Sequence, residues 1–181
     1  MPTLTRRNLL KWGLVLAGAS VAPSLALAKT RLALPERALA FYNTHTGETL
    51  RTVYWAQDEY LADSLAEINH ILRDHRTNET TAMEARLLDL LFALQGRVEN
   101  TRPFEIISGY RSPASNAALA VRSDGVASKS LHMQGMAIDI RLPGCALKDL
   151  RDAALALRAG GVGYYPKSDF VHIDTGRVRR W

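Results

Sequence analysis

Two histidines and one aspartate in the second half of this 181-residue chain have the types and spacing of metal ligands. His132 and Asp139 lie in the segment Ser-Leu-His-Met-Gln-Gly-Met-Ala-Ile-Asp, and His172 follows in Phe-Val-His-Ile-Asp. Catalytic zinc sites use such a set, because three protein ligands leave the fourth position of the ion open for water. The bound ion lowers the pKa of that water and polarises a carbonyl group. The pattern therefore predicts a hydrolase with one Zn²⁺ per chain.

The spacing also indicates which elements must position these side chains. His132 and Asp139 are seven residues apart, too far along a helix to bind one ion, so we expect a loop that leads into a strand. Gly135 permits the close turn that such a loop requires. His172 is then expected to come from a neighbouring strand.

The remaining chain predicts an α+β fold. Apolar residues at helical spacing indicate two long helices, the first ending near residues 76–78, and shorter apolar runs indicate strands. Strands are expected over residues 37–43, 49–55, 105–107, 136–142, 163–165 and 170–173. Helices are expected after caps at Asp58, Thr81 with Glu84, and Ser112, and over residues 147–159. We expect a small antiparallel sheet that carries the zinc site and packs against these helices.

The first 28 residues have the features of an export signal. Arg6 and Arg7 form a twin arginine in a polar segment, and a moderately apolar run follows over residues 12–27. Ala-Leu-Ala at its end supplies the small residues that a signal peptidase requires. We predict a twin-arginine signal peptide over residues 1–28, cleaved after Ala28, with the twin-arginine translocase and signal peptidase as export partners and the periplasm as destination.

A membrane anchor is the alternative interpretation of this segment. Its apolar run has about 16 residues, fewer than the roughly 20 of a spanning helix, and Pro23 interrupts it. We therefore expect no stable membrane anchor. Without residues 1–28, the chain has 20 basic and 18 acidic residues, so no nucleic-acid partner is indicated. The single Cys145 has no partner for an internal disulfide.

Several segments resemble a known peptidase family. The spacing of His132 and Asp139, with the internal Gly and Ala and the later His172, is similar to that of zinc D-alanyl-D-alanine peptidases, which belong with lysostaphin-type peptidases and the hedgehog zinc domain. Further matches are Ser-Gly-Tyr-Arg at 108–111 and, to the exported murein endopeptidase K branch, residues 41–48, 54–55 and 161–166. The resemblance extends from about residue 34 to 181. It implies a D-Ala-D-Ala metallopeptidase/hedgehog-like fold and a single zinc peptidase domain over residues 29–181.

The resemblance also implies roles for individual residues. It implies that His132, Asp139 and His172 bind the metal, and that Arg111 holds the substrate or the developing oxyanion. A guanidinium suits the latter role because it stays charged and donates several fixed hydrogen bonds. A structural salt bridge after a strand is the alternative explanation for Arg111.

Two aspartates are candidates for the general base. The family often has a glutamate three residues before its last histidine ligand, and Asp169 occupies that position here. In a regular strand this position faces away from His172, so Asp169 requires a turn of the chain. Asp174 shares the strand face of His172 and could act as the base or orient an imidazole.

The predicted function is that of a zinc-dependent murein endopeptidase that hydrolyses the peptide cross-links between peptidoglycan stem peptides. A carboxypeptidase that trims a terminal residue and a non-catalytic module that retains zinc and binds peptidoglycan are the alternatives. Both D,D and L,D linkages are open as the cleaved bond. Some aromatic residues could line an open groove, although aromatic residues near strand ends commonly pack in the core: Tyr110, Tyr164, Tyr165 and Trp181.

Overall fold

The computed structural model describes residues 35–122 and 127–181, so the predicted signal peptide and its cleavage site lie outside the described residues. In the described ranges, no helix combines the length and apolar character needed to cross a membrane. The strands are Arg37–Asn43 (β1), Thr49–Ala56 (β2), Glu59–Tyr60 (β3), Phe104–Ser108 (β4), Ala137–Arg141 (β5), Gly161–Tyr165 (β6), Phe170–Asp174 (β7) and Arg179–Arg180 (β8). The helices are Ala62–Ile71 (α1), Ala85–Arg97 (α2), Pro113–Arg122 (α3), Leu147–Leu157 (α4) and the 3₁₀ turn Leu131–Gln134 (η1).

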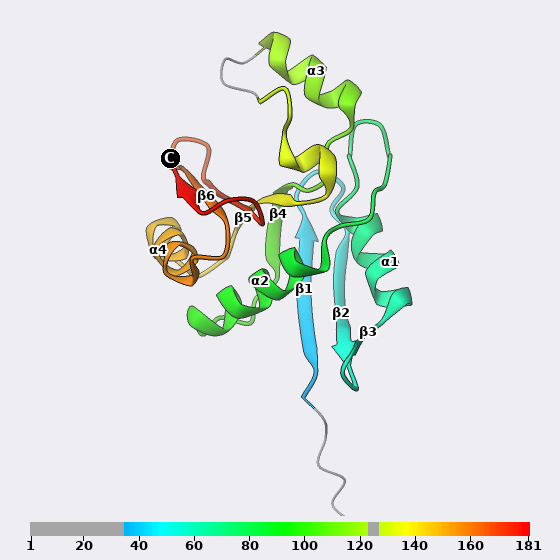
Figure 1. Cartoon of the computed structure of the whole chain (residues 1–181), viewed down its shortest axis with the longest axis vertical. Coiled ribbons are helices and arrows are strands. Elements are labelled where there is room, and N and C mark those ends of the chain that lie inside the picture. The colour runs from blue at the N-terminus through cyan, green and yellow to red at the C-terminus, as the bar shows by residue number, and fades with distance from the viewer. Residues whose placement is uncertain (1–34, 123–126) are drawn as a thin grey trace, which may run out of the picture. The chain divides into compact units, whose positions relative to one another are not determined.

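The described strands form one sheet with the order β3-β2-β1-β4-β5-β7-β6-β8 (Figure 1). The predicted α+β class is confirmed, and the strands that carry the site, β5 and β7, are antiparallel as expected. The sheet is larger than expected, and its β1–β4 and β6–β8 pairs are parallel. The strands at its two edges, β3 and β8, have only two residues each, which is too short to leave an alternating pattern in the sequence.

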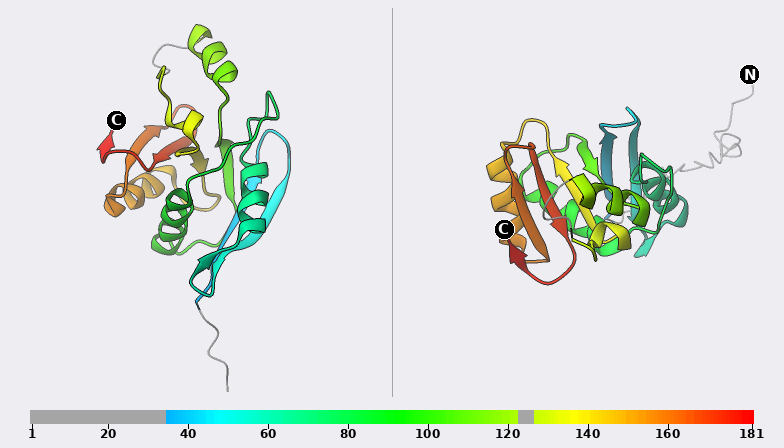
Figure 2. Two further views of the ribbon diagram at one scale, coloured as in Figure 1. Left: turned by 45° about the vertical axis from the view of Figure 1, so that its right-hand side comes forward. Right: turned by 90° about the horizontal axis from the view of Figure 1, so that it is seen from above.

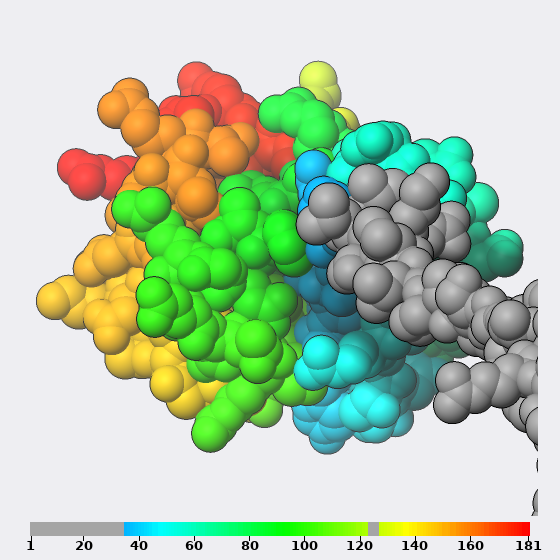
Figure 3. All heavy atoms as spheres, turned by 90° about the horizontal axis from the view of Figure 1, so that it is seen from below, coloured from blue at the N-terminus to red at the C-terminus, as the bar shows by residue number. Residues whose placement is uncertain are grey.

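Apolar side chains of β5 determine which face carries the site. Ile138 and Ile140 are fully buried with leucines of α2, such as Leu91. Because side chains alternate along a strand, Asp139 points to the opposite face. Helix α2 packs against β1 and α4, and α4 packs against β6 and β7. Figure 3 shows atoms of α2, in green, beside those of α4 and the segment before it, in orange and yellow.

The first helix is shorter than the apolar stripe predicted. Asp58 does not cap it, because this residue lies in the turn between β2 and β3 with φ of 65°. Helix α1 begins at Ala62 and ends at Ile71, before the predicted end near residues 76–78. The stripe continues past the helix because Leu72 is also fully buried in the core.

The predicted capping box of the second helix is also wrong. Helix α2 begins one residue after Glu84, and no side chain caps it. The Glu84 carboxylate instead accepts a hydrogen bond from the Thr175 hydroxyl, 91 residues away. A tertiary contact therefore replaces the local bond to Thr81. The cap of α3 is confirmed, since the Ser112 hydroxyl accepts from the Ser115 backbone N–H at 3.2 Å. Figure 2 shows that α3 projects from the end of β4, away from α2 and α4.

Candidate metal centre

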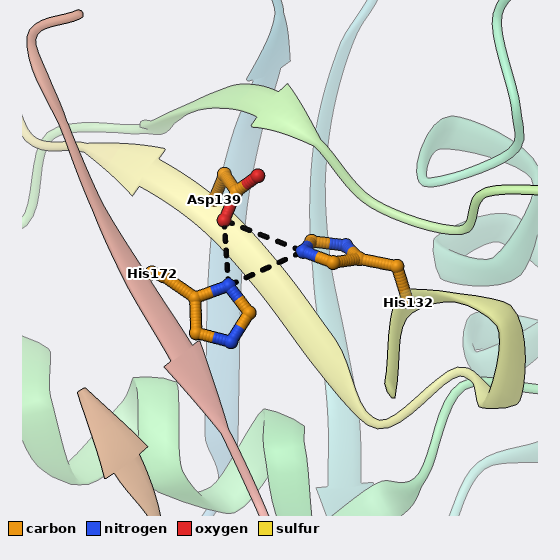
Figure 4. A group of neighbouring side chains, drawn as sticks. All are labelled: His132, Asp139 and His172. Atoms are coloured by element: carbon orange, nitrogen blue, oxygen red, sulfur yellow. Dashed lines mark hydrogen bonds and ion pairs between the residues drawn. The ribbon is translucent and has the colours of Figure 1, made fainter. Parts of the chain in front are cut away.

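Three side chains from three elements converge on one point (Figure 4). His132 comes from η1, Asp139 from β5 and His172 from β7. Asp139 and His172 are direct partners in the antiparallel β5–β7 pair. Asp139 Oδ1 lies 2.8 Å from His172 Nδ1 and 3.3 Å from His132 Nε2, and the two nitrogens are 3.2 Å apart. The loop-and-strand arrangement expected from the sequence is therefore present.

Both imidazoles are oriented by hydrogen bonds on their outer nitrogens. His132 Nδ1 donates to the Gly109 carbonyl oxygen at 2.7 Å. His172 Nε2 donates to Asp174 Oδ2 at 3.1 Å. Burial alone would raise the pKa of Asp174, but hydrogen bonds from His172, Arg179 and backbone N–H groups hold it well below its usual range, so this carboxylate only accepts. When the ring is neutral, its inner nitrogen then carries no proton and has a free lone pair.

These lone pairs form a set that suits a zinc ion. Two nitrogens and one carboxylate oxygen face one another with no proton between them when both rings are neutral. A cation removes the repulsion among them. Tetrahedral zinc with bonds of 2.0–2.1 Å separates its ligand atoms by about 3.3 Å. The measured separations of 2.8–3.3 Å need only small adjustments to match this value.

The loop before β5 is fixed tightly enough to place His132. Ser130 precedes η1, and its hydroxyl accepts from the His132 backbone N–H at 3.4 Å. Gly135 ends this turn with φ of 67°. A Cβ atom on Gly135 would lie 2.4 Å from the Ala82 carbonyl oxygen, so both the backbone angle and the space favour glycine. The close turn predicted at this glycine is confirmed.

Arg111 lies against this group with spare hydrogen-bonding capacity. Its side chain is 12% exposed, and Nη2 is 3.8 Å from Asp139 Oδ2. The bonds to Ser108 and Asn116 are both long, at 3.4 Å, and Nε has no partner among the described residues. Burial lowers the pKa of the guanidinium, opposed by the nearby Asp139 carboxylate. The structural salt bridge raised as the alternative by the sequence is present as this ion pair with Asp139, which is longer than a direct hydrogen bond.

Asp74 anchors the segment that carries Arg111, and no sequence motif drew attention to it. The residue is buried, with 1% of its surface exposed. Asp74 Oδ2 accepts from the Ser112 backbone N–H at 2.8 Å, and Oδ1 accepts from that of Arg76 at 3.0 Å. Burial alone would raise the pKa of Asp74, but hydrogen bonds from Ser115, Arg76 and Ser112 lower it well below its usual range.

We expect Asp74→Asn to lower the free energy of unfolding by roughly 1–3 kcal/mol at neutral pH, the cost of disrupting buried hydrogen bonds. The depressed pKa of Asp74 stabilises the fold fully above about pH 4, its unfolded-state pKa. This contribution is lost as the pH falls further. Urea denaturation should therefore show a gap between the two proteins that narrows from pH 5 to pH 2. Asp58→Asn, in an exposed turn, is the matched control, and an equal loss there would contradict the account.

The two candidate bases occupy different environments. The chain does turn at Asp169, which has φ of 56° and precedes β7. The turn, however, directs its carboxylate to Arg141 Nη1 at 2.9 Å, and the side chain is 63% exposed. Asp174 is fully buried and contacts His172, but both of its oxygens are engaged, because Arg179 and the Gly161 backbone N–H also donate to it.

The other histidines lie outside the group. His45 and His75 stack with ring centroids 3.7 Å apart, and His45 Nε2 bonds the Ile107 carbonyl oxygen. His70 Nε2 is 4.0 Å from a Glu48 carboxylate oxygen. In the part of the chain that the structure describes, they belong to no set of three or more metal-ligating side chains.

The mixed sheet, its helices and the His/Asp/His group define a protein of the D-Ala-D-Ala metallopeptidase type. A family model described as Peptidoglycan L,D-endopeptidase MepK matches residues 31–181, and the chain belongs to this family. The peptidoglycan L,D-endopeptidase MepK of Escherichia coli K12 is 46% identical over 176 residues, which cover 97% of this chain and 96% of the relative. A probable MepK of Haemophilus influenzae is 37% identical over 177 residues, which cover 97% and 95%. The resemblance to the murein endopeptidase K branch is thereby confirmed.

Proposed function

We propose that this protein is a zinc-dependent endopeptidase that cleaves peptide cross-links of peptidoglycan in the periplasm. The convergence of three ligand lone pairs from His132, Asp139 and His172 carries this proposal, because it calls for a cation beside an open coordination position. The sequence left both D,D and L,D linkages open. We infer the L,D linkage, since it is the bond in the printed names of the relatives.

The zinc ion, when bound, would polarise the scissile carbonyl and lower the pKa of a bound water. The protein side chains would hold the ion and orient the groups around it. His132 and His172 would each direct the inner nitrogen to the ion, because the Gly109 carbonyl and Asp174 accept from the outer N–H groups and so fix the tautomer. Asp139 supplies one oxygen and leaves the other toward Arg111.

Arg111 is proposed to bind the substrate or the oxyanion that develops at the cleaved carbonyl. Its guanidinium donates only long hydrogen bonds in the described structure. It can therefore turn a terminal nitrogen to a new acceptor without giving up a strong bond. A donor held in a mostly buried site stabilises developing charge more than one in water.

Asp174 is proposed as a positioning residue rather than the base, because it fixes the outer nitrogen of His172. We expect Asp174→Asn to weaken zinc affinity by about 10- to 100-fold, the usual effect of removing such a partner. Competition with a chelating dye measures this change. Zinc affinity equal to that of the unmodified protein, with turnover lost, would instead make Asp174 the base.

Asp169 is not expected to act as the base while its carboxylate pairs with Arg141. We expect Asp169→Asn to keep turnover on cross-linked peptides within about threefold of the unmodified protein, and to retain zinc. A fall of about 10²–10⁴, typical of losing a general base, would restore the role suggested by the family position.

Digestion of purified peptidoglycan tests the proposed activity. We expect cross-linked dimers to become monomers with zinc present and to persist when a chelator is added. Release of a single terminal amino acid would favour the carboxypeptidase, and zinc-dependent sedimentation with peptidoglycan without cleavage would favour the binding module. Export through residues 1–28 is part of the proposal, and N-terminal sequencing of the periplasmic protein checks cleavage after Ala28.

A further inference from the structure

Trp181, directly after β8, lies beside the candidate metal centre. Its ring centroid is 5.2 Å from that of His172. The Trp181 backbone continues the parallel β6–β8 pair, since Tyr164 N–H donates to its carbonyl oxygen at 3.0 Å and its own N–H donates to Val162. Strand β8, drawn in red at the C-terminal end of the chain in Figure 1, lies beside β6. The position of this tryptophan next to His172 is therefore set by the sheet.

The indole ring is also held in a defined orientation. Its Nε1–H donates to the Tyr165 hydroxyl at 2.7 Å, and Tyr165 in turn stacks on Phe170 with centroids 4.6 Å apart. Gly163, the partner of His172 in β6, leaves the space that the ring occupies. A Cβ atom on Gly163 would lie 2.7–2.9 Å from indole atoms. The Arg179 guanidinium lies 4.8 Å from the ring centroid and connects it to Asp174.

Despite these contacts, Trp181 remains 50% exposed. A rigid aromatic side chain offers a large contact area at little cost in conformational entropy, and tryptophan is enriched among residues that dominate binding energy. We propose that Trp181 binds the substrate, with its exposed surface covering an apolar part of the stem peptide next to the cleaved bond, and that Tyr165 positions the indole. This inference rests on the proposed function.

Steady-state kinetics on a cross-linked muropeptide dimer test this role. We expect Trp181→Ala to raise KM by about tenfold, the effect of losing one strong contact, with kcat changed less than about threefold. Tyr165→Phe, which removes only the acceptor of the indole N–H, should raise KM by a smaller factor. Tyr42→Phe is the matched control, because this tyrosine lies in β1, which β4, β5 and β7 separate from β6 in the sheet. It should leave both constants unchanged.

A purely structural role makes the opposite prediction. It would lower zinc affinity and melting temperature in Trp181→Ala while KM stays normal, and that result would overturn the proposal. If Trp181→Ala does not fold, Trp181→Phe and Tyr165→Phe still decide, because both retain an aromatic ring at the altered position. Normal KM in both variants would also overturn it.

Fluorescence provides a test that is independent of turnover. The chain has three tryptophans, so the full-length Trp12→Phe/Trp55→Phe variant emits from Trp181 alone. We expect a monomeric muropeptide to shift this emission to shorter wavelength and to reduce quenching by iodide. Binding detected by calorimetry without any change in emission would refute the role of Trp181. If the unmodified protein cleaves no dimer while the emission shifts, the proposed activity fails and the binding role of Trp181 stands.

Discussion

His172→Ala is expected to abolish both zinc retention and peptide release. The substitution removes one of three converging ligand atoms and leaves His132 and Asp139 unable to complete the set. Loss of the metal removes several kcal/mol of transition-state stabilisation, which corresponds to a fall in turnover of about 10³-fold or more. Zinc content by atomic absorption and dimer cleavage by chromatography measure the two effects.

His70→Ala is the matched control for this prediction. His70 is a histidine of the same chain whose imidazole is exposed and faces Glu48. It should keep about one zinc per chain and full activity. Full zinc occupancy in His172→Ala would show that the ion binds elsewhere, and the proposed ligand set would then be wrong.

Arg111→Lys should retain zinc and lose turnover by about 10²–10³-fold, the usual cost of removing one donor from an oxyanion. Lysine keeps the charge but cannot reproduce the planar fork of the guanidinium. The variant should bind zinc normally, because Arg111 is not one of the ligands and its contact with Asp139 Oδ2 is long, at 3.8 Å. Single-turnover cleavage of a muropeptide dimer measures the loss.

Arg122→Lys, at the exposed end of α3, provides the comparison for Arg111→Lys. Turnover should be unchanged in this variant. If Arg111→Lys keeps normal turnover as well, the guanidinium serves the fold rather than the reaction. A parallel loss of zinc and turnover in Arg111→Lys would instead place Arg111 in support of Asp139.

The sequence predicts the grouping of the candidate ligands because local rules determine it. Gly135 forces the turn that returns the chain from His132 into β5, and alternation along β5 separates Asp139 from the buried Ile138 and Ile140. For His172, the sequence predicts only that it lies on a strand next to the one that carries Asp139. Its register with Asp139 depends on the whole sheet.

Features that depend on distant contacts were not predictable in this way. Glu84 resembles a capping residue but bonds Thr175, and Asp169 turns as its role required but pairs with Arg141. Asp74 carries no motif, and its importance follows from backbone N–H groups that approach it only in the folded chain. The sequence indicates Trp181 only as one of several aromatic residues that could line a groove, because its place beside His172 depends on backbone bonds to β6. Local propensity cannot rank such tertiary hydrogen bonds and ion pairs against the local alternatives.

Cleavage of defined muropeptide dimers tests the central claim most directly. The zinc-loaded protein is incubated with dimers joined through an L,D bond and, separately, through a D,D bond, and the products are resolved by mass. We expect the L,D-linked dimer to yield two monomers and the D,D-linked dimer to remain intact, with all cleavage stopped by a chelator. Cleavage of the D,D-linked dimer alone, or cleavage that persists after zinc is removed, would contradict the account.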